Sequence, residues 1–290
     1  MKRADNEECN LSGSAAAAFI NLIESGTYQK LKQQETFLDQ SKEALRGMLY
    51  HYEGKRHEFK EINYVAKFVS KNVWQTNHAG LIEELLCYVQ PNIAAAAIQL
   101  DVKKIKEANE EGCNVHHLLT PYKNPDTYYV RPTLNKLGKR QIRTHDYLFG
   151  GQSIEELVTE IRDNTVTFKA YAEEYEHFKK AAEQCPVLNG NYKVTTPYGS
   201  VSLLSNRPTW NIENIFNEMG EEFIVSYGKV DMSKLEELIL QGLIPKSMVS
   251  PFRKLLDIRL DFVVMNMSSE EKAVNFHRNK QIQASLKRFA

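Results

Sequence analysis

The sequence has few of the features that identify secreted or membrane proteins. Its four cysteines are far apart in the 290-residue chain and form no CxxC pair, a pattern that favours a reducing cytoplasm over a disulfide framework. The apolar runs at 15–23 and 93–100 fall well short of the roughly 20 residues that a membrane-spanning helix needs. The first residues are too polar for a signal peptide. We therefore expect a cytoplasmic protein that contacts no membrane.

The sequence also lacks a net charge and the common catalytic motifs. Lys and Arg number 37, as do Asp and Glu, so the formal charge is zero. This balance excludes a wholesale acidic DNA mimic and a protein held to nucleic acid by bulk charge, because either needs a strong excess of one sign. Neither a glycine-rich nucleotide loop nor a G-x-S-x-G or H-E-x-x-H motif occurs. We expect a protein that is not an enzyme and needs no cofactor.

One short cluster has the chemistry of a metal or catalytic site. Cys113, His116 and His117 form a C-x-x-H half-site of the kind that zinc binds. A second half-site with paired spacing is missing, so no metal is expected. An enzyme of unfamiliar type that uses this loop stays as the weakest alternative.

The two tryptophans lie in matching contexts, which indicates an internal duplication. Residues 64–74 and 200–210 each begin as a β-type run, pass through Ser, Asn and a basic residue, and end at Trp. Further along, 101–112 and 231–242 share Asp, Lys, Glu and Gly at identical spacing. A diverged duplication is the simplest interpretation, and the two Trp segments should then occupy corresponding places.

The periodicity predicts an α+β fold that is mainly α-helical. It has two related helix–β-hairpin–helix halves and a C-terminal helical region. Short segments at 223–227 and 250–256 are expected to be a strand and a helix, and the centre of the chain is expected to have little regular structure. The expected organisation is a flexible leader at 1–13, a first module at 14–112, a connector at 113–152, a second module at 153–245 and C-terminal helices at 246–290.

The connector is the strongest candidate for a binding site. Between residues 122 and 145 six basic residues stand against one acidic residue, a local charge of +5, and tyrosines flank them. Arginine with tyrosine suits a protein hot spot, and it equally suits phosphate contact with base stacking. A solvated basic loop is the third interpretation. The candidate partner-binding or nucleic-acid-binding residues are Tyr129, Arg131, Lys136, Lys139, Arg140 and Arg143.

Two long helices with broad apolar stripes, at 28–52 and 153–184, favour self-association. One small β element in each half covers little of these stripes, so a second copy is the simplest cover, and a homo-oligomer is expected. The alternative is that the two helices pack on each other within one chain.

The order of elements over residues 153–245 resembles that of phage Gam-like proteins. The resemblance is carried by a long charged helix, a hairpin containing Pro-Tyr-Gly-Ser-Val-Ser-Leu, and then Val-Asp-Met-Ser-Lys-Leu-Glu-Glu-Leu; residues 30–112 show it more faintly. Members of that family bind DNA ends or inhibit host nucleases. The chain's size also resembles that of phage anti-defence inhibitors, such as those that assemble around the Gabija nuclease complex. The resemblance implies a phage-type accessory protein that binds and inhibits a host nuclease or defence complex in the bacterial cytoplasm. The alternative is a DNA-binding recombination or replication accessory protein.

Overall fold

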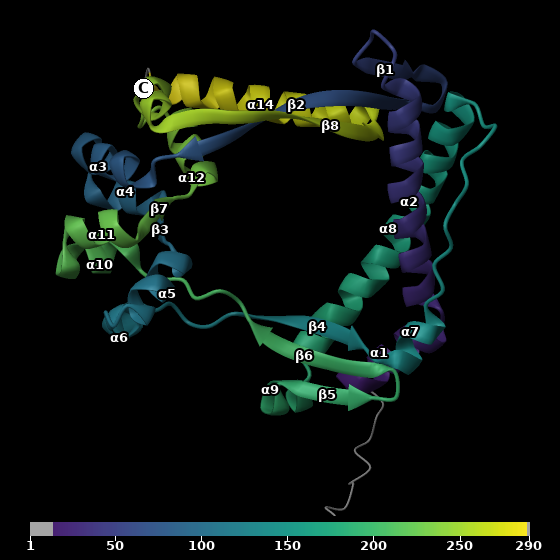
Figure 1. Cartoon of the computed structure of the whole chain (residues 1–290), viewed down its shortest axis with the longest axis horizontal. Coiled ribbons are helices and arrows are strands. Elements are labelled where there is room, and N and C mark those ends of the chain that lie inside the picture. The colour runs from purple at the N-terminus through teal and green to yellow at the C-terminus, as the bar shows by residue number, and fades with distance from the viewer. Residues whose placement is uncertain (1–13, 289–290) are drawn as a thin grey trace, which may run out of the picture. The chain divides into compact units, whose positions relative to one another are not determined.

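The computed structural model describes residues 14–288 and shows a mixed α+β chain (Figure 1). Helix accounts for 59% and strand for 21%, so the expected α+β class with a majority of helix is confirmed. Within the described range no helix is both long enough and apolar enough to cross a membrane. The expected leader at 1–13 lies outside the described residues.

The elements of the first part of the chain begin with two consecutive helices and a hairpin. In order they are α1 (Ala15–Glu24), α2 (Thr27–Leu49), β1 (Arg56–Phe59), η1 (Lys60–Ile62), β2 (Tyr64–Thr76), α3 (His78–Tyr88), α4 (Pro91–Ala96), β3 (Ile98–Leu100), α5 (Val102–Glu110), α6 (Val115–Leu119), η2 (Thr120–Tyr122), β4 (Tyr128–Leu134) and α7 (Lys136–Gln141).

The second part repeats much of this order. Its elements are α8 (Ile154–Glu183), α9 (Pro186–Asn191), β5 (Lys193–Thr196), β6 (Gly199–Ser205), α10 (Ile212–Met219), α11 (Glu221–Tyr227), β7 (Gly228–Val230), α12 (Met232–Leu240), α13 (Lys246–Val249), η3 (Ser250–Phe252), β8 (Arg253–Asn266) and α14 (Met267–Arg288).

The repeated order is that of a duplicated module whose last strand is exchanged. Each copy has a long helix, a hairpin, two helices, a three-residue strand, two further helices, a 3-10 turn and then a last strand; α9, between α8 and β5, has no counterpart. The sheets have the orders β1-β2-β8 and β4-β6-β5. The hairpin of each copy is therefore completed by the final strand of the other copy.

The two short strands join the copies in a symmetric way. β3 and β7 pair antiparallel, with Gln99 opposite Lys229. The amide of Asp101 donates to the carbonyl of Tyr227 at 2.8 Å, and the amide of Asp231 donates to the carbonyl of Ala97, also at 2.8 Å. Both aspartates then cap the following helix with their carboxylates. This is the local geometry of a two-fold axis that passes between β3 and β7.

The two tryptophan segments follow the same pattern, although the tryptophans differ in burial. Trp210 forms an isolated β-bridge with Lys123, and the guanidinium of Arg253 lies 4.7 Å from the centre of the Trp74 ring. These basic residues directly follow η2 and η3. Trp210 is 8% exposed, whereas Trp74 is 39% exposed. The segments thus take corresponding places in the element order.

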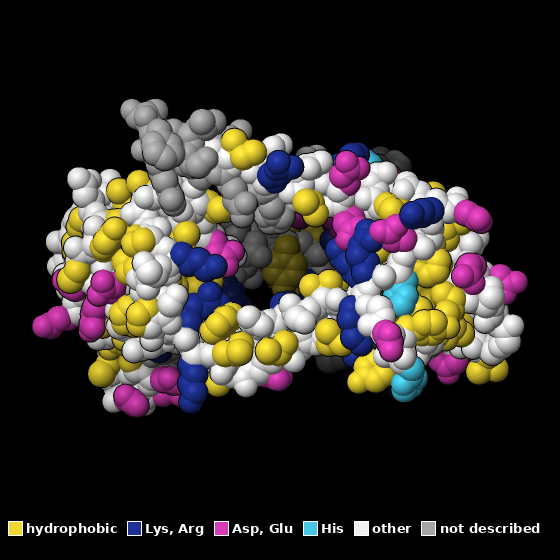
Figure 2. All heavy atoms as spheres, turned by 90° about the horizontal axis from the view of Figure 1, so that it is seen from above, with side chains coloured by type: hydrophobic (Ala, Val, Ile, Leu, Met, Phe, Trp, Pro, Cys, Tyr) yellow, Lys and Arg dark blue, Asp and Glu magenta, His cyan; other side chains and the backbone are white. Residues whose placement is uncertain are grey.

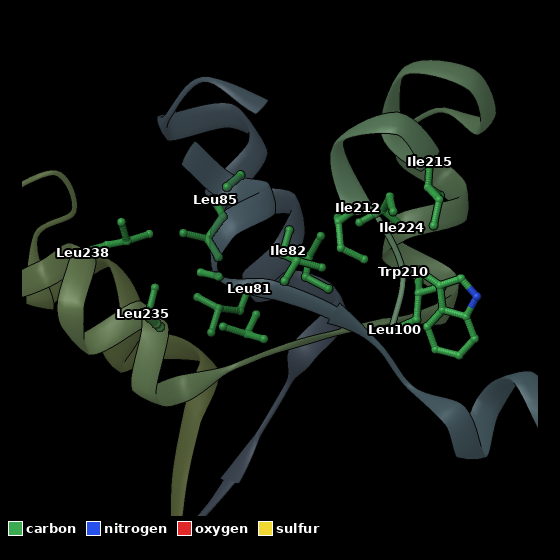
Figure 3. Packing of buried hydrophobic residues seen from close by; sticks show 14 of the residues in the cluster. Leu81, Ile82, Leu85, Leu100, Trp210, Ile212, Ile215, Ile224, Leu235 and Leu238 are labelled. Atoms are coloured by element: carbon green, nitrogen blue, oxygen red, sulfur yellow. The ribbon is translucent and has the colours of Figure 1, made fainter. Parts of the chain in front are cut away.

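Helices α3, α4 and α5 of the first copy and helices α10, α11 and α12 of the second copy share one hydrophobic core (Figure 3). α3 packs against α11, and α10 packs against α4, so each helix pair is closed by helices of the other copy. The fully buried residues of this core come from both copies and include Leu81, Ile82, Leu85, Ile215, Ile224 and Leu235.

The two long helices form an antiparallel pair. Tyr28 of α2 contacts Tyr175 of α8 with ring centres 5.5 Å apart, and the buried Leu31, Leu38 and Leu45 lie along α2. The apolar stripes therefore cover each other within one chain, and the reason given above for self-association is wrong. The sequence showed the stripes but not their antiparallel pairing.

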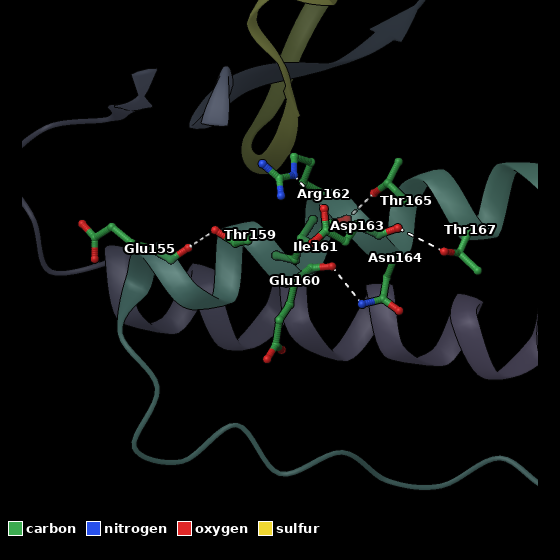
Figure 4. A network of polar contacts seen from close by, with 9 residues as sticks. All are labelled: Glu155, Thr159, Glu160, Ile161, Arg162, Asp163, Asn164, Thr165 and Thr167. Atoms are coloured by element: carbon green, nitrogen blue, oxygen red, sulfur yellow. Dashed lines mark hydrogen bonds and ion pairs between the residues drawn. The ribbon is translucent and has the colours of Figure 1, made fainter. Parts of the chain in front are cut away.

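α8 begins at the expected capping box and continues for 30 residues. Ser153 accepts a hydrogen bond from the amide of Glu156, whose carboxylate accepts one from the amide of Ser153. Thr and Asn residues inside the helix bond carbonyls four residues back, as Thr165 does to Ile161 at 2.6 Å (Figure 4). These bonds satisfy side chains that otherwise compete with the helical backbone.

Three local expectations are wrong. The centre of the chain, expected to be irregular, holds α6, η2, β4 and α7, because β4 obtains its hydrogen bonds from β6, about 70 residues away in the sequence. Residues 223–227, expected to be a strand, belong to α11, since a short apolar run has no distinctive period. Residues 250–256 form η3 and the start of β8, so the C-terminal region is not purely helical.

The chain divides into two compact units that do not follow the order of the sequence. One unit contains residues up to 67, residues 126–206 and residues 262–266. The other contains residues 68–125, residues 207–261 and the residues from 267 onward. Each unit takes residues from both copies, as expected when the final strands are exchanged.

Gly228 lies where the shared core leaves no room for a side chain. A Cβ atom there would meet the carbonyl oxygen of Ile224 and would lie 2.9 Å from Cδ1 of Ile82. We expect Gly228→Ala to lower the free energy of unfolding by about 1–3 kcal/mol, measured by urea denaturation. Gly47→Ala, at a helical position with no atom within 4 Å, is the control and should be neutral or slightly stabilising. Equal effects of the two substitutions would contradict this account of the core.

Tyr175 makes the helix pair sensitive to alkaline pH. Burial raises the pKa of its hydroxyl to about 12, whereas an unfolded tyrosine titrates near pH 10. Between these values the unfolded chain loses the proton and the folded chain keeps it, so stability present below about pH 10 is lost as the pH rises toward 12. Thermal melts of wild type and Tyr175→Phe should diverge over this range, with the variant losing less stability. Parallel curves would show that this hydroxyl is not buried in solution.

Candidate functional site

β4 displays two of the predicted site residues on one exposed face. Val130 is buried among α1, α8 and the hairpin, while Tyr129 and Arg131 on either side of it are exposed. Side chains alternate along a strand, so Tyr129 and Arg131 share the face of the β4-β6-β5 sheet that points away from this core. We call this surface the outer sheet face.

Hydrogen bonds hold β4 in place at both ends. The amide of Asn206 donates to the carbonyl of Thr127 at 2.8 Å, beside the start of the strand. At the other end, the amide of Asn135 donates to the carbonyl of Tyr198 at 3.0 Å, and its side-chain amide donates to the carbonyl of Pro197 at 2.8 Å. The outer sheet face is therefore carried on a rigid strand, not on the loose loop that the sequence suggested.

The register places a second basic residue in line with Arg131. Arg131 of β4 is opposite Ser202 of β6, which is opposite Lys193 of β5. All three lie on the outer sheet face, with a hydroxyl between two cations. Neighbouring strands lie about 4.8 Å apart, so the two cationic side chains start from backbones about 10 Å apart. An acidic group placed over Ser202 could reach both of them.

Hydroxyl groups and an apolar group complete this face. The next row across the sheet consists of Thr133, Ser200 and Thr195, and the row on the other side pairs Tyr129 with Leu204. The face thus offers cations, hydrogen-bonding hydroxyls and one aromatic ring. This composition suits recognition of a polar, acidic surface.

Three predicted basic residues lie on α7, which follows β4 directly. Lys136, Lys139 and Arg140 are exposed, and their spacing places them on neighbouring positions of one helix side. Asn135 caps α7 through a 2.9 Å bond from the amide of Gly138. The backbone of α7 packs closely on the β5–β6 turn at Gly138, so these three side chains lie beside the end of the sheet.

Arg143 does not join this group. It lies in an extended segment that runs along α2, and its carbonyl accepts a hydrogen bond from Nε2 of Gln33 at 2.9 Å. Tyr147 of the same segment packs edge-on against Phe37 of α2 with ring centres 5.0 Å apart. The predicted set is therefore divided between the sheet with α7 and the side of α2.

The basic residues of this region lack acidic partners. Over residues 14–288, no ion pair involves Arg131, Lys193 or the basic residues of α7. By contrast, Lys103 and Lys106 of α5 pair with carboxylates four residues away, at 3.7 Å and 3.6 Å. On the face drawn in Figure 2, both basic and acidic side chains are present. Unpaired cations gathered on one sheet face are therefore a local feature of this chain.

The Cys113 cluster shows no grouping that would hold a metal. Cys113 is exposed after α5, and the amide of His116 donates to the side-chain carbonyl of Asn109 at 3.1 Å. Nowhere in the part of the chain that the structure describes do three or more His, Cys, Asp or Glu side chains gather as metal ligands. His116 instead lines a hollow of about 450 Å³ beside α5, together with Trp210.

Sequence reasoning missed Lys193 and Ser202 as partners of Arg131. Lys193 lay within the expected hairpin, but nothing in the sequence indicated that β4 would pair with β6. Comparison with protein-family models, with curated proteins and with solved structures finds no match to this chain. The support for the site is thus its own geometry: register, exposure and unpaired charge.

The exposure of these residues predicts that the fold tolerates their replacement. Arg131→Glu combined with Lys193→Glu should change the free energy of unfolding by no more than about 0.5 kcal/mol, because both side chains are exposed and form no ion pair within the described residues. Thermal unfolding followed by circular dichroism measures this. A loss of several degrees in Tm would mean that the two side chains serve the fold and not a partner.

Proposed function

We propose that this protein is a non-enzymatic binding protein that holds an acidic partner on its outer sheet face. The observation that carries the proposal is the row of Arg131, Ser202 and Lys193, in which two unpaired cations flank a hydroxyl beside Tyr129. A rigid strand keeps the ordering cost of binding low. Tyr and Arg are the residue types that dominate protein interfaces.

The partner that we favour is a protein with an acidic surface. In the narrower form of the proposal, the chain is a phage-type accessory protein that binds and inhibits a host nuclease or defence complex in the bacterial cytoplasm. This form rests on the resemblance of residues 153–245 to phage Gam-like proteins. A basic face complements an acidic face across a protein interface.

Single-stranded nucleic acid is the second candidate, and one observation favours it. Tyr129 and Arg131 lie two residues apart on the same exposed strand face. An aromatic ring next to a cation on an open sheet is the arrangement that stacks a base and contacts its phosphate. Duplex DNA fits less well because the face is small and the chain carries no net charge.

Affinity capture from an expressing bacterium tests the proposal. We expect wild type to retain a specific protein and Arg131→Glu/Lys193→Glu to lose it, since charge reversal adds repulsion across the interface. The matched control is Lys169→Glu/Lys180→Glu, which reverses the same number of exposed positive charges but on α8. Binding that survives in the sheet variant but not in the α8 variant would place the interface elsewhere.

Salt separates the two partner classes. Nucleic-acid binding through phosphate contacts should weaken steeply between about 50 mM and 200 mM salt, whereas a packed protein interface should change little. A gel shift with single-stranded and duplex DNA at both salt concentrations measures this. A shift at the lower salt that is lost at the higher salt and is abolished by Arg131→Glu/Lys193→Glu would favour the nucleic-acid alternative.

A further inference from the structure

β8 is a long strand at the edge of its sheet. It covers 14 residues at the edge of the β1-β2-β8 sheet, with β2 as its neighbour. Three of its apolar side chains face solvent: Leu255 is 41% exposed, Leu256 57% and Ile258 57%. A long edge strand with exposed apolar residues is a ready template for pairing with another strand.

The equivalent strand of the other copy is protected against such pairing. β4 is half as long, with 7 residues, and carries Pro132 on its sheet edge. Proline removes a backbone donor and blocks the addition of a further strand. No proline lies between residues 253 and 266. The equivalent edge strands of the two copies therefore differ, since β4 contains a proline that blocks strand addition and β8 does not.

The charges along β8 complement each other when the strand meets a second copy of itself. Consider two antiparallel β8 strands related by a two-fold axis at Ile258. Asp257 of each copy is then opposite Arg259 of the other, and Leu256 is opposite Leu260. An opposite-charge pair therefore occurs twice, with apolar pairs on the opposite face of the ribbon.

Neighbouring registers are less favourable. An axis at residue 257 or at residue 259 sets Asp opposite Asp or Arg opposite Arg, and like charges directly opposite are destabilising. An axis at residue 260 sets Arg259 opposite Asp261, but it extends the pairing over residues 262–266, whose side chains are half-buried. Only the axis at Ile258 centres the pairing on the exposed stretch.

A local hydrogen bond at the centre of this stretch is compatible with the same pairing. The amide of Ile258 donates to the carboxylate of Asp257 at 2.8 Å, so the carboxylate lies over the backbone of the strand. This local bond leaves the side-chain positions of the proposed register unchanged.

We propose that β8 forms the interface of a two-fold dimer, in which the β8 strands of two copies pair antiparallel about Ile258. The occupant of the open edge is a second copy because the strand is complementary to itself in charge. This interface is distinct from the outer sheet face, and it does not depend on the function proposed above.

Charge exchange between Asp257 and Arg259 tests the register directly. Wild type should have twice the monomer mass of 33.4 kDa by light scattering at micromolar concentration. Asp257→Arg and Arg259→Asp should each be monomeric, because each sets like charges opposite each other twice. A mixture of these two variants should dimerise, and the double variant Asp257→Arg/Arg259→Asp should dimerise by itself.

Two controls distinguish loss of the proposed interface from misfolding and from pairing in another register. Asp261→Asn should remain dimeric, because residue 261 is opposite Leu255 in the proposed register and the substitution adds no like charge beside Lys71, which lies 3.9 Å from the Asp261 carboxylate. The monomeric variants should melt cooperatively by circular dichroism, and their recovery on mixing shows directly that they are folded. A monomeric wild type, dimers in both single variants, or a mixture that stays monomeric would each overturn the proposal.

Discussion

The pairing of β3 with β7 is the constraint on which the rest of the second compact unit depends. These strands have only three residues each, yet they place Asp101 and Asp231 where their amides bond the opposite copy and their carboxylates cap the next helix. An isolated two-stranded pair of this length has little stability of its own. Its stability comes from the helices of both copies that bury Leu81, Ile82 and Ile224 beside it. Neither copy has this core without the other.

The exchange of final strands extends this dependence to the sheets. The amide of Asn211 donates to the carbonyl of Tyr122 at 2.9 Å, and the amide of Asn77 donates to the carbonyl of Phe252 at 2.8 Å. Each bond fixes the point at which the chain leaves one copy's helices and enters the other copy's sheet. A fused pair of modules that swap a strand has the geometry of a domain-swapped dimer made from one chain. In such a protein the two exchanged strands, here β4 and β8, can differ in length and sequence while both complete a sheet.

The sequence predicts those parts of the fold that depend on residues close together in the chain. The class, the long helices, the capping box at Ser153 and the hairpin before Trp210 follow from periodicity and turn chemistry. The exchange of β4 and β8 could not be found in this way, because their partners are distant in sequence. The same limit explains the site. Tyr129 and Arg131 were visible as a basic, aromatic segment, but Lys193 joins them only through the register of three strands.

The divergence of β4 from β8 gives a physical reason for two different surfaces on one duplicated chain. β4 is short, contains Pro132 and is held by hydrogen bonds at both ends. Its outer face is therefore exposed, while the proline hinders the addition of a further strand at its edge. β8 is twice as long, has no proline, and exposes an edge that matches itself in charge. If β8 pairs two copies, each dimer has two outer sheet faces. For a partner whose repeated subunits match the spacing of the two faces, the second contact is intramolecular, which raises the overall affinity without any new interaction. A small neutral protein could in this way hold a large acidic complex without a broad basic surface that would also bind nucleic acid.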